Sequence, residues 1–159
     1  MFKVGDRIVH PLHGAGVIDK IDKTRENGSE KDFYVLKFFS GDMSVRIPAE
    51  KSADIGLRPI ISKGSALKIL NAFPDITVQA GDSNWNRRYR ENMDRIRSGD
   101  PMEVASVVKN LMARDQRRGL STGERRMLHF AKDILVSEMT MSMDMPEGEI
   151  EDKLALAVG

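Results

Sequence analysis

The sequence contains one tryptophan, Trp85, which stands two residues before a run of arginines and a tyrosine. The residues Asp82, Ser83 and Asn84 precede it, and short polar side chains of this kind accept hydrogen bonds from the free N–H groups of a first helical turn. We therefore predict a helix from about residue 84 to 98, with Trp85 in its first turn. A large apolar ring beside several guanidinium groups is suited to binding nucleic acid.

The same residues have a purely structural interpretation. Trp85, Tyr89, Met93 and Ile96 recur at helical spacing and share one face of the predicted helix. An aromatic residue at the head of such a stripe is more often part of a core, and a row of arginines is often only a solvated face. The arginines on the other faces are Arg87, Arg88, Arg90, Arg95 and Arg97. Periodicity alone therefore favours a packing role for Trp85, so other parts of the sequence have to decide between packing and nucleic-acid binding.

Other residues that could carry chemistry give weaker signals. His10 and His13 have an H-x-x-H spacing, but proline and glycine make this segment a turn, and no carboxylate lies nearby in the sequence. The glycines at 14 and 16 precede a predicted strand, so no helix dipole is available there to bind a phosphate. We find no cysteine, no nucleophile motif and no constellation of carboxylates. The sequence therefore supports no enzyme, and we expect neither a metal nor another cofactor.

The composition is that of a folded, soluble protein. The chain has 159 residues, of which 40% are hydrophobic and 31% are charged, enough for one ordinary domain or two small ones. Its N-terminus has no apolar run of signal-peptide length, and no segment is long and apolar enough to span a bilayer. We therefore expect a cytoplasmic protein that does not contact membranes, and the absence of cysteine agrees with this expectation.

The net charge of +1 conceals an uneven distribution. Residues 82–137 carry 12 Lys and Arg against 8 Asp and Glu, whereas residues 138–159 carry 1 against 6. A local basic surface can bind phosphate in a nearly neutral protein, because its field extends over about a Debye length of ~8–10 Å at physiological salt. The acidic end of the chain is better interpreted as the solvated face of a last helix.

The first third of the chain reads as short strands joined by tight turns. Asn27-Gly28 is among the strongest signals for a hairpin, because both residues tolerate positive φ. We predict strands around residues 7–10, 17–21, 33–39 and 43–48, with a tight turn over 12–16. Four or five such strands indicate a small, strongly bent sheet or SH3-like half-barrel.

After residue 60 the apolar period changes to that of helices. Helix-start signals are found at Ser62, at Asp100-Pro101 and in the capping box formed by Ser121 and Glu124. We predict about five helices, and we expect the one that carries the alternating methionines at 139–145 to unwind there. The chain is therefore an α+β protein, with a β module over residues 1–60 and an all-α module over 61–159.

The β module also suggests a surface for a partner. Its strands at 33–39 and 43–48 are rich in apolar residues, and an open edge of a half-barrel can add a partner's strand through backbone hydrogen bonds. Most of these side chains have to fill the core. Arg46 faces away from Val45 and Ile47 and is the better candidate for a partner contact.

Several segments, in order along nearly the whole chain, resemble the bacterial CarD family of RNA polymerase-binding transcription regulators. They are F-K-V-G-D at 2–6, H-G-A-G at 13–16, Y-V-L-K at 34–37, V-R-I-P-A-E at 45–50, G-L-R at 56–58, N-W-N-R-R-Y-R at 84–90 and L-S-T-G-E-R-R-M-L at 120–128. The resemblance implies a Tudor-like N-terminal module that binds the RNA polymerase β subunit and a helical module that binds DNA. It also implies that a tryptophan wedged into the minor groove at the upstream edge of the bubble stabilises the open promoter complex.

The resemblance assigns roles to individual residues. The tryptophan of the motif is Trp85, and the DNA contacts around it fall on Arg87, Arg88 and Arg90. The contacts to the polymerase β subunit fall on Arg46, Pro48, Arg25, Thr24 and Val35; at position 24 some relatives have arginine where this chain has threonine. We expect a monomeric regulator that binds polymerase and promoter DNA with little sequence specificity. The alternative is an adaptor whose helical module binds another protein and whose arginines only solubilise it.

Overall fold

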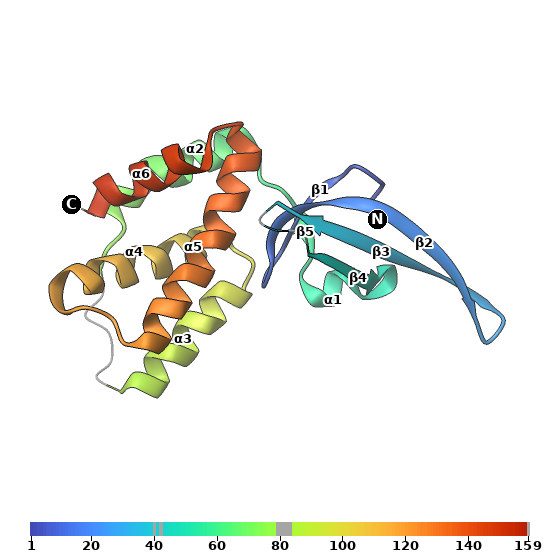
Figure 1. Cartoon of the computed structure of the whole chain (residues 1–159), viewed down its shortest axis with the longest axis horizontal. Helices are drawn as coiled ribbons and strands as arrows, with labels where there is room; N and C mark the ends of the chain where they lie inside the picture. The colour runs from blue at the N-terminus through green and yellow to red at the C-terminus, as the bar shows by residue number, and fades with distance from the viewer. Residues whose placement is uncertain (40, 42, 79–83, 159) are drawn as a thin grey trace. The chain divides into compact units, whose positions relative to one another are not determined.

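The chain divides into two compact units, Met1–Ile60 and Ile61–Gly159, in a computed structural model that describes residues 1–39, 41, 43–78 and 84–158. The first unit is built around an antiparallel sheet, and the second consists of helices (Figure 1). Strands therefore precede helices without alternating with them, which confirms the predicted α+β class.

The sheet of the first unit has five strands in the order β4-β3-β2-β1-β5, and each neighbouring pair is antiparallel. The strands are β1 (Arg7–His10), β2 (Gly14–Glu26), β3 (Ser29–Phe38), β4 (Ser44–Pro48) and β5 (Arg58–Pro59). This confirms the predicted small β module. Both β4 and β5 are edge strands, since each pairs with one neighbour in this sheet.

The longest strands, β2 and β3, form a hairpin that Figure 1 shows extending away from the rest of its sheet. Its turn is Asn27-Gly28, and both residues have positive φ, 50° and 77°, as a two-residue hairpin turn requires. The predicted hairpin is thus confirmed, although β2 begins at Gly14 and not near residue 17. Gly16 lies within β2 and not in the turn predicted for it. A Cβ at this position would lie 2.5 Å from the Lys37 carbonyl oxygen, so glycine is needed here for the close pairing of β2 with β3.

The sheet bends where the pairing register of β2 with β3 shifts between Ile18 and Lys20. Such a bulge increases local twist and curvature, which bends the sheet around its own apolar face. That face forms the core of the unit: Ile8, Ile18, Tyr34, Leu36, Phe38, Ile47 and Leu57. The Tyr34 hydroxyl accepts a hydrogen bond from the Phe2 backbone N–H at 3.1 Å, which ties the beginning of the chain to this core.

Two short helical turns between β4 and β5 were not predicted from the sequence. They are the 3-10 helix η1 (Ala49–Lys51) and the one-turn helix α1 (Ser52–Ile55). Segments this short carry no helical repeat of apolar residues, so periodicity cannot detect them. Gly56 ends α1 in the left-handed conformation with φ of 92°, a common way to stop a helix.

The second unit contains five α-helices among its described residues, as predicted. They are α2 (Lys63–Ala72), α3 (Trp85–Arg97), α4 (Pro101–Arg118), α5 (Thr122–Met143) and α6 (Glu147–Val158), with a short 3-10 helix, η2 (Phe73–Asp75), after α2. In Figure 1, α3 and α5 begin at the same end of the unit.

The predicted helix starts are confirmed by their hydrogen bonds. Ser62 accepts from the Ser65 N–H at 3.1 Å, and Asp100 accepts from the Met102 N–H at 2.9 Å. At the beginning of α5, Ser121 and Glu124 satisfy each other's backbone N–H groups as a capping box. The helix ends at Met143, where the expected unwinding occurs.

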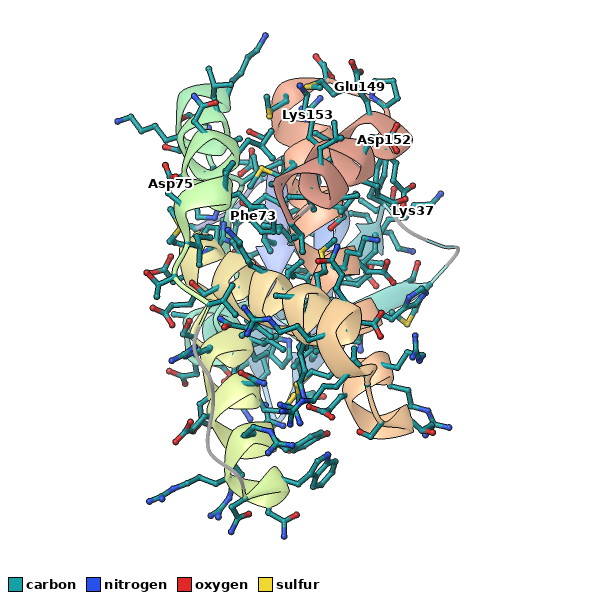
Figure 2. All side chains as sticks on the ribbon, turned by 90° about the vertical axis from the view of Figure 1, so that its left-hand side faces the viewer. Lys37, Phe73, Asp75, Glu149, Asp152 and Lys153 are labelled. Atoms are coloured by element: carbon teal, nitrogen blue, oxygen red, sulfur yellow. The ribbon has the colours of Figure 1, made fainter. Side chains whose placement is uncertain are left out.

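The core of the second unit is formed mainly by α4 and α5, with α2, α3 and α6 packed around them. Its fully buried side chains include Phe73, Ile96, Val107, Val108, Leu135, Met139, Ile150 and Leu154. Figure 2 shows Phe73 among the helices, whereas Asp75, Glu149, Asp152 and Lys153 lie at the surface of the unit. A buried lysine, Lys109, donates hydrogen bonds to the Phe73 and Pro74 carbonyls, so its charge is satisfied where α2 and η2 end.

Candidate functional site

The first two turns of α3 expose a tryptophan and two arginines. Asn84 caps the helix by accepting a hydrogen bond from the Arg87 N–H at 3.2 Å, while the other predicted capping residues, Asp82 and Ser83, lie outside the described residues. The cap fixes the direction in which the first turn presents its side chains. Trp85 is 42% exposed, and Arg87 and Arg90 are also exposed.

Trp85 is exposed on one side and held on the other. Its ring stacks on that of Tyr89, with centroids 5.3 Å apart and an interplanar angle of 23°. Its indole N–H donates to the Ser121 hydroxyl over 3.4 Å, and a Cβ placed on Gly123 would lie 3.0 Å from its Cζ2 atom. The ring is thus oriented by its own helix and by the beginning of α5.

The predicted apolar face of α3 divides after its second turn. Ile96 is fully buried and Met93 is partly buried, as expected, but Tyr89 is 39% exposed and is not the core residue that its spacing predicts. The neighbour that its ring contacts is the half-exposed Trp85 ring, on which it stacks. Tyr89 therefore extends the exposed aromatic surface of Trp85.

Arg88 is turned away from the arginines that flank it in the sequence. Its side chain is 15% exposed, and its Nη2 lies 3.8 Å from the Glu124 Oε2 atom on α5. Arg87 and Arg90, by contrast, are exposed near Trp85. The three arginines expected to act together therefore do not form one surface.

In the first unit, four of the five residues expected to contact polymerase share one face of the sheet. The pairing places Val35 opposite Arg46, Phe33 opposite Pro48 and Lys31 opposite Thr24. Directly paired residues lie on the same side, and side chains alternate along a strand. Thr24, Val35, Arg46 and Pro48 therefore lie on the face opposite the core, while Arg25 lies on the other face of the hairpin.

Arg46 is positioned by two neighbours that sequence reasoning missed. Its guanidinium carbon lies 3.9 Å from the centroid of the Phe33 ring, and its Nε lies 3.6 Å from the Asp22 Oδ2 atom. Its side chain is still 48% exposed on the edge strand β4. Strand alternation could have revealed Phe33, because it places this ring on the face of Arg46. Val35, only 9% exposed, has little surface to offer a partner.

The two histidines of the H-x-x-H segment lie close together. Their ring centroids are 4.5 Å apart, and the Nδ1 atom of His10 accepts a hydrogen bond from the Leu12 N–H at 3.0 Å. Burial, and secondarily the nearby His13, lowers the pKa of His10 from 6.5 to about 4. Across the described ranges, no three metal-binding side chains are grouped together.

No helix in the part of the chain that the structure describes is both long and apolar enough to cross a bilayer.

Comparisons with known proteins cover almost the whole chain. The family model of the CarD-like/TRCF RID domain matches residues 2–61, and that of the CarD C-terminal domain matches residues 67–155. The chain is also similar to YdeB of Bacillus subtilis (strain 168), a protein named as a proposed transcription factor. The two are 32% identical over 155 residues, which span 95% of this chain and 98% of the relative.

Proposed function

The chain belongs to the CarD family of transcription regulators, and we propose that it acts by binding RNA polymerase and promoter DNA at the same time. In this proposal the helical unit holds the upstream edge of the melted promoter, and the β unit binds the polymerase β subunit. The outcome is a longer-lived open complex. The protein acts as a monomer, and no chemical step is required of it.

The observation that carries the DNA-binding role is the exposed aromatic pair at the beginning of α3. Trp85 presents a free edge beside the exposed Arg87 and Arg90, and it is held in place by Tyr89 and Ser121. Minor-groove proteins insert apolar wedges between base steps and gain binding energy from phosphate contacts and distorted DNA. A held, half-exposed indole near two exposed arginines suits that task, and it requires no reading of base edges.

The β unit supports the polymerase-binding role through its outer face and free edge. The edge strand β4 presents Arg46 over the Phe33 ring, with Pro48 two residues further on the same face. Arginine and aromatic side chains are enriched at the energetic centres of protein interfaces. Thr24 and Arg25 lie further along the hairpin and would contribute from its two faces. Two weak contacts suffice, because binding through one unit raises the effective concentration of the other.

The experiment that tests the proposal measures the lifetime of open promoter complexes with purified polymerase and the full chain. We expect the wild-type protein to lengthen the lifetime and Trp85→Ala to lose most of this effect while still binding polymerase. Leu67→Ala is the matched control, because Leu67 on α2 is a large apolar residue that is similarly exposed, at 47%. Equal effects of the two variants would reject the wedge.

The alternative of an adaptor without DNA contact is separated by salt. DNA binding through phosphates weakens steeply as ionic strength rises, because the release of counterions from the DNA contributes less free energy at high salt. A protein that retains polymerase binding but has no affinity for duplex DNA, even at low salt, would support the adaptor.

A further inference from the structure

A pocket lined by arginines lies within the helical unit, between α3, α4 and α5. It has a volume of about 190 Å³, and its charged lining is Arg88, Arg95, Arg114, Arg117, Arg118, Glu91 and Glu124. Leu111 and Glu124 are buried, whereas Glu91, Arg117 and Arg118 are exposed at the rim. The pocket is therefore open on the side where α4 ends.

The pocket has a surplus of positive charge. Five arginines and two glutamates line it, and one of the arginines, Arg95, also pairs with Glu103 outside the lining, with its Nε 3.7 Å from Oε2. The carboxyl end of α4 contributes only about half a negative charge, so it does not reverse the sign. At the floor, the single carboxylate of Glu124 faces two guanidinium groups, with the Arg114 Nε at 3.3 Å and the Arg88 Nη2 at 3.8 Å.

From this arrangement we propose that the pocket binds a phosphate group, presented either by a small phosphorylated molecule or by a nucleic-acid backbone. Guanidinium groups match phosphate oxygens with two parallel hydrogen bonds, and several arginines around one opening can surround such a group. At about 190 Å³ the pocket is smaller than the ~300–1,000 Å³ typical of whole-ligand sites. It therefore suits a phosphate or diphosphate group and not an entire nucleotide. The proposal does not rest on the open-complex function.

The floor of the pocket is connected to the tryptophan. Glu124 accepts a hydrogen bond from the Ser121 hydroxyl at 3.1 Å through its Oε1 atom, while its Oε2 atom faces the arginines. The same Ser121 hydroxyl accepts from the Trp85 indole. An anion that draws Arg88 and Arg114 away from Glu124 would alter the surroundings of Ser121. Because Trp85 is the only tryptophan, its fluorescence reports on the pocket.

The test titrates the full chain with sodium diphosphate at constant ionic strength, balanced with sodium chloride, and follows Trp85 fluorescence and binding heat. We expect saturable binding to one site. Replacing both rim arginines, Arg117→Gln with Arg118→Gln, should weaken it at least about tenfold, since each lost charge-assisted bond costs roughly that much. The matched control replaces Arg97 and Arg126, which are exposed and do not line the pocket, and should leave the affinity within about twofold.

Two results would overturn the proposal: no saturable diphosphate binding, or equal weakening by the rim and control pairs. A second measurement, with a short DNA duplex, identifies the source of the phosphate. If diphosphate displaces the duplex and the rim pair weakens duplex binding, the pocket holds a backbone phosphate. If duplex affinity is unchanged by the rim pair while diphosphate binding is lost, the pocket serves a free phosphorylated molecule.

Discussion

The indole N–H of Trp85 donates a hydrogen bond to the hydroxyl of Ser121 over 3.4 Å, although the two residues lie at the beginnings of different helices. Ser121 is at the same time the N-cap of α5, since its hydroxyl accepts from the Glu124 N–H at 3.2 Å. The orientation of the tryptophan is therefore linked to the residue that starts α5. Gly123 completes this arrangement by leaving room for the ring.

Gly123→Ala should displace the Trp85 ring without weakening the fold. The added Cβ would lie 3.0 Å from Cζ2, so the ring must move, whereas alanine favours a helix by up to about 1 kcal/mol over glycine. Gly148→Ala is a matched control, because Gly148 is likewise the second residue of its helix and a Cβ there meets nothing within 4 Å. We expect both variants to melt at or above the wild-type temperature, and only Gly123→Ala to change tryptophan fluorescence. Identical spectra would mean that Gly123 does not hold the ring.

Trp85→Ala should cost much less stability than a core substitution in the same helix. We expect a loss of about 1–2 kcal/mol, because the half-exposed ring gives up only its contacts with Tyr89 and the beginning of α5. Ile96→Ala is the comparison, since Ile96 is fully buried and should lose about 2–5 kcal/mol. Urea unfolding of both variants measures the difference. If Trp85→Ala proved as costly as Ile96→Ala, the tryptophan would be a core residue.

The sequence predicts the elements of this fold better than the surroundings of single side chains. The caps at Ser62, Asp100 and Ser121 and the Asn27-Gly28 turn are local chemistry, so they were predictable. The exposure of Tyr89 was not predictable, because helical spacing shows that residues share a face but not whether another element covers that face. The same limit applies to Arg88, whose inward direction depends on a carboxylate 36 residues away in the sequence.

The arginines beside Trp85 should differ from other exposed arginines in their effect on DNA binding. If Arg87 and Arg90 contact phosphates, Arg87→Gln and Arg90→Gln should each reduce the slope of log K against log salt by about 0.9. Arg97→Gln removes the same charge from the last turn of the same helix and should leave the slope nearly unchanged. Binding of the full chain to a duplex at several salt concentrations gives the slopes. A similar change for all three variants would indicate attraction by total charge only.

His10 should make the β unit less stable in mild acid. Its pKa is lowered from 6.5 to about 4 in the folded state, so below pH 6.5 the unfolded chain binds the proton first. The contribution of neutral His10 to the free energy of unfolding is fully present above pH 6.5. It is lost progressively as the pH falls towards 4. From pH 7.5 to 5 the loss should be about 2 kcal/mol.

His10→Asn tests this pH dependence, because its side-chain oxygen can still accept from the Leu12 N–H but does not titrate. Urea unfolding followed by NMR of the Ile8 and Ile18 methyl groups reports on the core of the β unit. We expect the variant to show a much smaller loss between pH 7.5 and 5. If wild type and variant lost the same stability, another group would be responsible.

Arg46→Glu should abolish binding to the polymerase β subunit and leave binding to free DNA unchanged. The substitution reverses the charge on the exposed edge strand, removes the cation from the Phe33 ring and places a second carboxylate beside Asp22. Because Arg46 is half exposed, the fold should lose no more than about 1 kcal/mol, which melting of the purified variant checks. Arg97→Glu carries the same charge change in the helical unit and should retain the β subunit in a pull-down. Undiminished capture of the β subunit by Arg46→Glu would remove Arg46 from the interface, whereas capture lost by both variants would show that the interaction depends on overall charge and not on this strand.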